Sequence, residues 1–224
     1  MSAALADVGS GLRDAVHGTQ ACFRTALQAL SNPGRLCALP WVATAGLQVP
    51  AACEGRAPMA EGTAALLLTL LDAECTLRLH GSLASDTAHA WLRFHTGVRP
   101  ALPGENAAFT VVRAAEVASS QWQAIDLGSD EAPQRGGTLI VEVPALADAD
   151  NPHRIVATSP RTTLRLRGPG IEDERQLTVS HVPASFWHYR IALSPRFPQG
   201  FELFLASGRW LAALPRSTRV ALDH

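Results

Sequence analysis

Two clusters of arginine, histidine and hydroxyl side chains have the residue types needed to bind an anion, and the first is the run 92–97 (Leu-Arg-Phe-His-Thr-Gly). It places Arg93 and His95 beside Thr96. An imidazole titrates near neutral pH, and a guanidinium holds a phosphate group through two parallel hydrogen bonds. The alternative interpretation is structural, because cations at the end of a helix face the negative end of its dipole. The sequence leaves both interpretations open.

The second cluster is Pro-Arg-Ser-Thr at 215–218, which follows an expected strand. One guanidinium and two hydroxyls at a strand end suit an oxyanion. In α/β domains, ligands collect at strand ends and in crevices. We therefore predict that Arg93, His95 and Arg216 line one cleft, with Arg24 of the first expected helix as a further member. The alternative is that each arginine pairs with one of the 20 Asp and Glu residues.

Other patterns point away from catalysis by this chain alone. No HExxH, GxSxG, GxGxxG or GKS/T motif occurs, no nucleophile with a matching base is visible, and the catalytic residues stay unknown. Gly168-Pro169-Gly170 predicts a tight turn rather than a phosphate loop, because Pro169 lacks a backbone N–H. His181 and His188 would share a helix face only if a helix continued through Pro183, so we predict no metal site.

All 19 basic residues are arginine, so the chain has no lysine. This composition excludes a lysine Schiff base with pyridoxal phosphate and a P-loop lysine, whatever its origin, although a GC-rich genome would explain it equally well. Cys22, Cys37, Cys53 and Cys75 show no metal-binding or redox spacing and stand among apolar neighbours. We expect them to be reduced, structural thiols.

The composition indicates a globular protein without a nucleic-acid or membrane partner. Of the 224 residues 47 % are hydrophobic, and the formal net charge is −1. No basic block occurs, and the longest apolar run, 64–71, is too short to span a bilayer. The first eleven residues lack the features of a signal peptide, so we expect a cytoplasmic protein.

Hydrophobic periodicity predicts an alternation of helices and strands, followed by a β-rich end. The first helix should place Leu12, Val16, Phe23, Leu27 and Leu30 on one face. The expected helices are 11–30, 61–71, 87–94, 114–125 and 186–193. The expected strands are 35–39, 76–80, 109–112, 138–143, 163–167, 176–182, 201–206 and 210–214. We predict a single α/β domain over 1–224, in which helices cover both faces of a mixed sheet.

Seven short motifs, taken together and in order, resemble the PhnH family, the H subunit of the bacterial carbon–phosphorus lyase system. The resemblance covers about residues 12–220, with departures at Gln199, Phe201 and Ser217. The motifs are Phe-Arg through Ser-Asn-Pro-Gly at 23–34, 67–72 (LLTLLD), 92–96 (LRFHT), 137–140 (GTLI), 166–171 (LRGPGI), 197–200 (FPQG) and 215–218 (PRST).

This resemblance implies a fold similar to a reduced pyridoxal-phosphate-dependent transferase that lacks the cofactor lysine, in agreement with the missing lysine here. It also implies a homodimer and partnership with the G, I and J subunits in a core complex. That complex converts ATP and a phosphonate to a ribose 1-phosphonate 5-triphosphate, with catalysis usually placed on other subunits. We therefore expect a supporting subunit of this complex without pyridoxal phosphate. The alternative is a phosphonate- or nucleotide-binding component with its own anion site.

Overall fold

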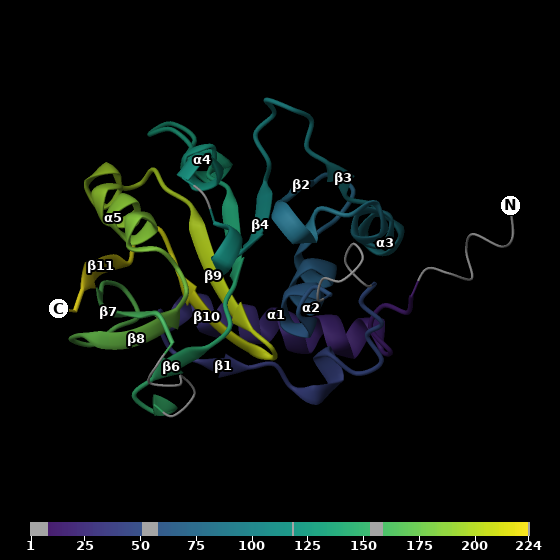
Figure 1. Ribbon diagram of the computed structural model, residues 1–224, viewed down its shortest axis with the longest axis horizontal. Coiled ribbons are helices and arrows are strands. Elements are labelled where there is room, and N and C mark those ends of the chain that lie inside the picture. The colour runs from purple at the N-terminus through teal and green to yellow at the C-terminus, as the bar shows by residue number, and fades with distance from the viewer. Residues whose placement is uncertain (1–8, 51–57, 118, 153–158, 224) are drawn as a thin grey trace, which may run out of the picture.

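A sheet of seven strands forms the centre of the part of the chain that the computed structural model describes, residues 9–50, 58–117, 119–152 and 159–223 (Figure 1). The strands are β1 (Cys37–Ala38), β2 (Thr76–Leu79), β3 (Arg99–Pro100), β4 (Phe109–Arg113), β5 (Thr138–Glu142), β9 (Glu202–Ser207) and β10 (Trp210–Leu214). Their order is β1-β10-β9-β5-β4-β2-β3. The five strands from β9 to β3 run parallel, whereas β10 pairs antiparallel with both β9 and β1. The sheet is mixed, as the sequence predicts.

The middle of this sheet is β5, which lies in the run 138–143 that is rich in β-branched residues and is predicted to be a strand. β5 pairs with β4 on one side and β9 on the other. Leu139 and Val141 point into one hydrophobic core, and Ile140 points into the other. Because both faces of β5 are covered, its consecutive side chains from Leu139 to Val141 are apolar, and the strand ends at Glu142.

Three helices cover one face of the sheet: α1 (Ala15–Ser31), α2 (Glu61–Leu70) and α3 (Asp86–Thr96). They share a core with Ile140 and Phe204 of the sheet. The helix expected over 87–94 extends from Asp86 to Thr96, because Ser85 Oγ accepts a hydrogen bond from the Ala88 N–H at 3.1 Å and Gly97 takes the left-handed conformation, with φ 79°. α2 is buried over most of its length, as expected for a helix that is apolar nearly all round.

The middle of the apolar face predicted for the first helix points outward, whereas Leu12 and Leu30 at its ends pack against the core. Val16, Phe23 and Leu27 are exposed, while the side of the helix that touches the core carries the small residues Cys22 and Ala26. Small side chains let α1 approach α2 and β10 closely. The periodicity of the large apolar residues therefore marks a surface of this helix, not its contact with the sheet.

A second, antiparallel sheet covers much of the opposite face, a layer that the prediction of helices on both faces does not include. Its strands are β6 (Leu146–Asp148), β7 (Arg161–Arg167), β8 (Arg175–Ser180) and β11 (Arg219–Leu222), in the order β11-β7-β8-β6. Two helices, α4 (Ser119–Gln123) and α5 (Ala184–Ala192), lie on the same side as this sheet. β6 has three residues and β11 four, so any hydrophobic alternation in them is short, and the sequence predicts neither.

The helix expected over 114–125 is broken in two. Ala114–Glu116 forms a single 3₁₀ turn, and the chain is extended at Val117 before α4 begins. Glu116 Oε2 accepts a hydrogen bond from the Ser82 N–H at 2.8 Å. This long-range bond holds the start of the segment against the residues that follow β2, and the segment's helical pattern contains no information about it.

The thiols that the structure describes are unpaired, and they differ in access. Cys22 is fully buried, and burial raises its pKa to about 11, whereas Cys75 is half-buried. Because the thiolate is the reactive form, iodoacetamide at pH 8 should modify Cys75 well before Cys22 in the native protein. Peptide mass spectrometry over time measures both rates, with guanidinium-unfolded protein as the control. Equal native rates would contradict the burial of Cys22. Cys53 lies outside the described residues.

Candidate functional site

Arg93 and His95 lie in the last turn of α3, where the structural interpretation places them. His95 Nε2 lies 3.0 Å from the Gly9 carbonyl oxygen, and Trp91 Nε1 donates to the same oxygen at 2.9 Å. These bonds hold the chain at Gly9 against α3. Arg93 is exposed close to the negative end of the helix dipole.

The structure does not bring the four predicted side chains together. α3 connects β2 to β3 at one edge of the large sheet, while Arg216 follows β10 near the other edge. Figure 1 shows α3 and the α5–β11 region at opposite ends of the molecule. Arg24 is exposed on α1, where its Nε donates to the Gln20 carbonyl at 3.4 Å. The pocket that Arg216 lines contains none of the other three.

Arg216 binds internal partners. Its Nε donates to Glu202 Oε1 at 2.6 Å, and its backbone N–H donates to Glu202 Oε2 at 3.0 Å. Its Nη1 donates to the carbonyl oxygens of Pro133 and Pro198. One carboxylate and the carbonyl groups of two loops thus fix the Arg216 side chain. Its ion pair with Glu202 agrees with the alternative interpretation, in which each arginine pairs with a carboxylate.

Two glycines make room for this side chain. A Cβ placed on Gly136 would lie 2.9 Å from Arg216 Nη1, and one on Gly200 would lie 3.0 Å from Arg216 Cβ. Both distances are closer than ordinary van der Waals contact, so a larger residue at either position would displace the guanidinium. Gly200 also has a φ of 149°, a backbone conformation that other residues rarely adopt.

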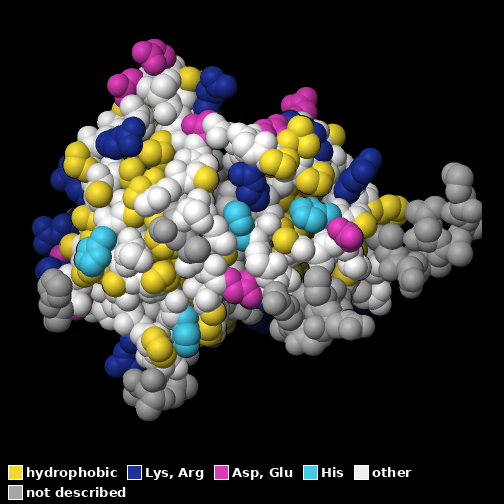
Figure 2. Space-filling model, turned by 45° about the horizontal axis from the view of Figure 1, so that its top comes forward, with side chains coloured by type: hydrophobic (Ala, Val, Ile, Leu, Met, Phe, Trp, Pro, Cys, Tyr) yellow, Lys and Arg dark blue, Asp and Glu magenta, His cyan; other side chains and the backbone are white. Residues whose placement is uncertain are grey.

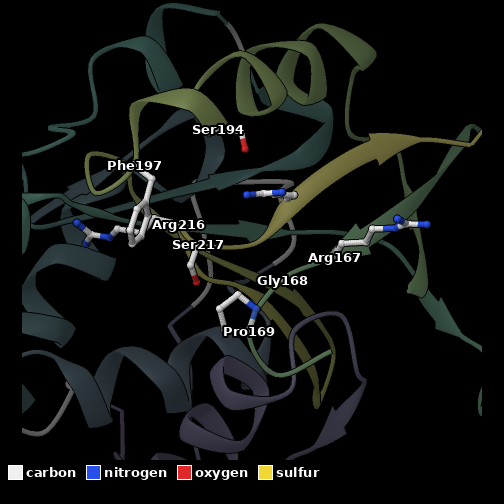
Figure 3. Close-up of a pocket in the computed structure, with 8 residues that line it drawn as sticks. Arg167, Gly168, Pro169, Ser194, Phe197, Arg216 and Ser217 are labelled. Carbon is white, nitrogen blue, oxygen red and sulfur yellow. The ribbon is translucent and has the colours of Figure 1, made fainter. Parts of the chain in front are cut away.

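Beside Arg216 lies a pocket of about 300 Å³, built from three segments that are far apart in sequence (Figure 3). They are the turn after β7, the connection between α5 and β9, and the loop 215–218 with the start of β11. The motifs at 166–171, 197–200 and 215–218 therefore meet at one place. The lining residues are Arg167, Gly168, Pro169, Ser194, Phe197, Arg216, Ser217 and Arg219.

Two of the lining arginines stand directly opposite each other on neighbouring antiparallel strands. Arg167 of β7 and Arg219 of β11 are register partners. Side chains in such positions have Cβ atoms about 4.5–5.5 Å apart, and like charges there are destabilising. Glu174 Oε2 accepts from Arg167 Nε at 3.0 Å. The Arg219 side chain has no hydrogen-bond or ion-pair partner among the described residues, so its charge is available.

The arginine-rich surface continues past this pair. A second pocket of about 210 Å³ shares Arg167 and Arg219 with the first and extends to Arg165 and Glu174. Arg165 pairs with Asp223 at 3.5 Å. Figure 2 shows arginine side chains along the end of the molecule that carries α5, β7 and β11 in Figure 1, on the left in both views.

A further arginine lies buried beneath loop 215–218. Arg190 of α5 is 2 % exposed, and its Nη2 donates to the carbonyls of Pro215 and Thr218 at 2.7 and 3.4 Å. Its Nε has no partner among the described residues. Burial lowers the Arg190 pKa to about 10, which leaves the group charged at neutral pH. Arg190 therefore fixes the loop and adds positive charge behind the pocket.

The chemistry available in this pocket is anion binding. Its ionisable lining groups are guanidinium groups, which remain protonated at neutral pH and donate hydrogen bonds without accepting them. Ser194 and Ser217 contribute hydroxyls. Sequence reasoning found Arg216 but missed Arg219, because it did not recognise β11. The available signal was the four-residue alternation of Arg219, Val220, Ala221 and Leu222, which in the structure alternates between exposed and more buried positions.

A second polar cluster lies at the carboxyl ends of β4 and β5, where parallel sheets often bind ligands. Arg113 donates to Glu142 Oε2 at 3.0 Å, to Ser82 Oγ at 2.6 Å and to the Pro58 carbonyl at 2.8 Å. Glu142 Oε1 accepts from the Ala60 N–H at 2.6 Å. These groups join the loops at this edge to one another.

In the described part of the chain, no three His, Cys, Asp or Glu side chains come together as a metal site requires. None of its helices is long and apolar enough to cross a membrane.

Comparison with known proteins agrees with the family resemblance of the motifs. The chain is 32 % identical over 209 residues to HtxG of Stutzerimonas stutzeri, which is named as a C-P lyase subunit protein, covering 91 % of this chain and 86 % of that one. It is 29 % identical over 209 residues to the alpha-D-ribose 1-methylphosphonate 5-triphosphate synthase subunit PhnH of Rhizobium meliloti (strain 1021), covering 92 % of each. The family model described as bacterial phosphonate metabolism protein (PhnH) matches residues 10–221. The chain therefore belongs to the PhnH family of bacterial phosphonate metabolism proteins.

Proposed function

We propose that the chain is a subunit of the carbon–phosphorus lyase core complex and acts in the catabolism of organic phosphonates. The observation that carries this proposal is the family match over residues 10–221, which includes every strand of both sheets except the last residue of β11. The names of both relatives support it, since each is described as a subunit, one of a C-P lyase and one of a ribose methylphosphonate triphosphate synthase.

In this proposal the chain supports the formation of a ribose 1-phosphonate 5-triphosphate from ATP and a phosphonate, while other subunits carry the catalysis. The pocket beside Arg216 is consistent with such a role, because guanidinium groups and hydroxyls bind charged ligands but offer no general base at neutral pH. The chain works in the cytoplasm as one domain over 1–224, and it holds no pyridoxal phosphate because it has no lysine to anchor it. Its fold is similar to that of the pyridoxal-phosphate-dependent transferases.

The proposed partners are the G, I and J subunits, and co-expression tests them directly. A tagged form of this chain should retain all three through affinity and size-exclusion steps. A strain without its gene should fail to grow on methylphosphonate as its phosphorus source and recover when the gene is restored. Elution of the tagged chain without G, I and J, or normal growth of the deletion strain, would overturn the proposal. Growth on inorganic phosphate is the control.

We also propose that the isolated chain forms a homodimer through the exposed stripe of α1. Val16, Phe23 and Leu27 lie within about 40° of one another around the helix axis, since they are 7 and 4 residues apart. Phe23 is 46 % and Leu27 49 % exposed. A row of large apolar side chains on an exposed helix face suits burial against a second copy of the same face.

Leu27→Asp should weaken this dimer. A leucine lost from an interface costs about 1.5–3 kcal/mol, so the dimer dissociation constant should rise about 10–100-fold. Light scattering over a concentration series measures the change. Leu102→Asp is the matched control, because Leu102 is also exposed (64 %) but lies in the loop after β3. Equal dissociation constants for the two variants would remove α1 from the interface.

A further inference from the structure

The repulsion between Arg167 and Arg219 is a feature of the pocket that the subunit proposal does not use. The two residues are register partners, and Glu174 compensates only the first. An unpaired guanidinium opposite another does not stabilise the folded protein. An anion bound to Arg219 would offset the repulsion and satisfy its free donors.

Two serine hydroxyl groups line the pocket together with these arginines. Ser194 and Ser217 both line the pocket, and neither side chain has a hydrogen-bond partner among the described residues. A hydroxyl donates to a phosphate oxygen as readily as to a carbonyl. Figure 3 shows both serines between Phe197 on one side and Arg167 on the other.

The walls of the pocket are held in place before any ligand arrives. Arg190 anchors loop 215–218 from below, and Glu202 fixes Arg216. At the opposite wall, a Cβ on Gly168 would lie 3.0 Å from the Ser217 carbonyl oxygen, so the turn after β7 touches this loop. Binding groups held in this way lose little conformational entropy when a ligand is bound.

Phe197 gives the pocket a second chemical character. Its ring is 61 % exposed and lines the pocket, although a large apolar ring gains nothing from contact with water. Aromatic side chains beside basic grooves stack on the bases of nucleotides. We propose that this pocket binds a nucleotide, with its phosphate on Arg219, Arg167 and the serine hydroxyls and its base on Phe197. A cavity of about 300 Å³ that continues into a second along Arg219 leaves room for both parts.

Calorimetry on the purified full chain tests the proposal with three probes. AMP contains both parts, ribose 5-phosphate lacks the base, and adenosine lacks the phosphate. AMP should bind at least about tenfold more tightly than either fragment, because stacking and charged hydrogen bonds each contribute about a factor of ten or more. Raising the salt concentration should weaken the binding of AMP and leave the binding of adenosine nearly unchanged.

Two variants assign the contacts. Arg219→Gln should weaken the binding of AMP and ribose 5-phosphate about 10–100-fold, and Phe197→Leu should weaken the binding of AMP and adenosine but not that of ribose 5-phosphate. Arg209→Gln, an exposed arginine in the β9–β10 turn, and Phe94→Leu, an exposed phenylalanine on α3, are the matched controls. All four positions are exposed, so circular dichroism should show unchanged folding.

The proposal fails if AMP gives no heat at millimolar concentration, or if Arg219→Gln and Arg209→Gln bind AMP equally. Equal affinities for AMP and ribose 5-phosphate, or no effect of Phe197→Leu, would overturn the assignment of a nucleotide. The experiment uses the chain without partners. Its outcome is therefore separate from membership of the complex, which co-purification decides.

Discussion

Replacing Phe186 with alanine will lower the free energy of unfolding by about 3–5 kcal/mol. Phe186 is fully buried, and its ring lies 5.0 Å from that of Trp187, 5.4 Å from Trp122 and 6.4 Å from Phe201, measured between centroids. These neighbours belong to α4, α5 and the segment that enters β9. The cavity left by the ring would lie between three elements, and two of the lost contacts are edge-to-face aromatic pairs, worth about 0.5–1.5 kcal/mol each.

Urea unfolding followed by circular dichroism measures this loss. Phe94→Ala is the control, because Phe94 is 54 % exposed and its removal should cost less than about 1 kcal/mol. If the two variants lost similar amounts, the second core would not be closed around Phe186 as the structure has it.

Glu202→Ala is expected to cost about 2–3 kcal/mol of stability. Glu202 accepts two hydrogen bonds from Arg216, and its negative charge offsets part of the lowering of the Arg190 pKa by burial. Without it, two arginines with little access to water would face each other uncompensated. Breaking a buried ion pair costs about 3–5 kcal/mol, and this one ranks lower because its side chains are 16 % and 25 % exposed.

Two variants separate the causes. Glu202→Gln keeps a hydrogen-bond acceptor but removes the charge. Its free energy of unfolding should therefore lie between those of the wild type and Glu202→Ala. Glu174→Ala breaks the exposed pair with Arg167, whose side chain is 69 % exposed, and should cost less than about 1 kcal/mol. A loss for Glu202→Ala no larger than that for Glu174→Ala would show that loop 215–218 does not depend on Glu202.

The sequence predicts well the elements whose apolar pattern agrees with their final burial. The run 138–143, the two strands β9 and β10, the buried α2 and the body of α3 are of this kind. In each, local propensity and tertiary packing favour the same structure. The family resemblance of the motifs is likewise confirmed by the match over 10–221.

The elements that escaped prediction depend on contacts distant in sequence. β11 is four residues long and exists through its pairing with β7, about fifty residues earlier. The helix expected at 114–125 is interrupted near Glu116, whose carboxylate binds Ser82. The candidate site follows the same rule, since Arg216 was recognised by type, but neither its pairing with Glu202 nor the position of Arg219 opposite Arg167 is visible in the sequence. Residue type alone also grouped Arg93 and His95 with it, although α3 holds them at the other end of the sheet.

The strand order also governs when this protein can fold during its synthesis. β5 has its second neighbour in β9, which begins at Glu202, and β10 must follow before β1 has a partner. While the ribosome adds the residues between them, the open edge of β5 and the apolar faces around it stay uncovered. An exposed edge of this kind is where nascent chains aggregate or recruit chaperones. The large sheet therefore closes only after β9 and β10 have been synthesised, and a chain stopped before Glu202 lacks the strand that joins its two halves.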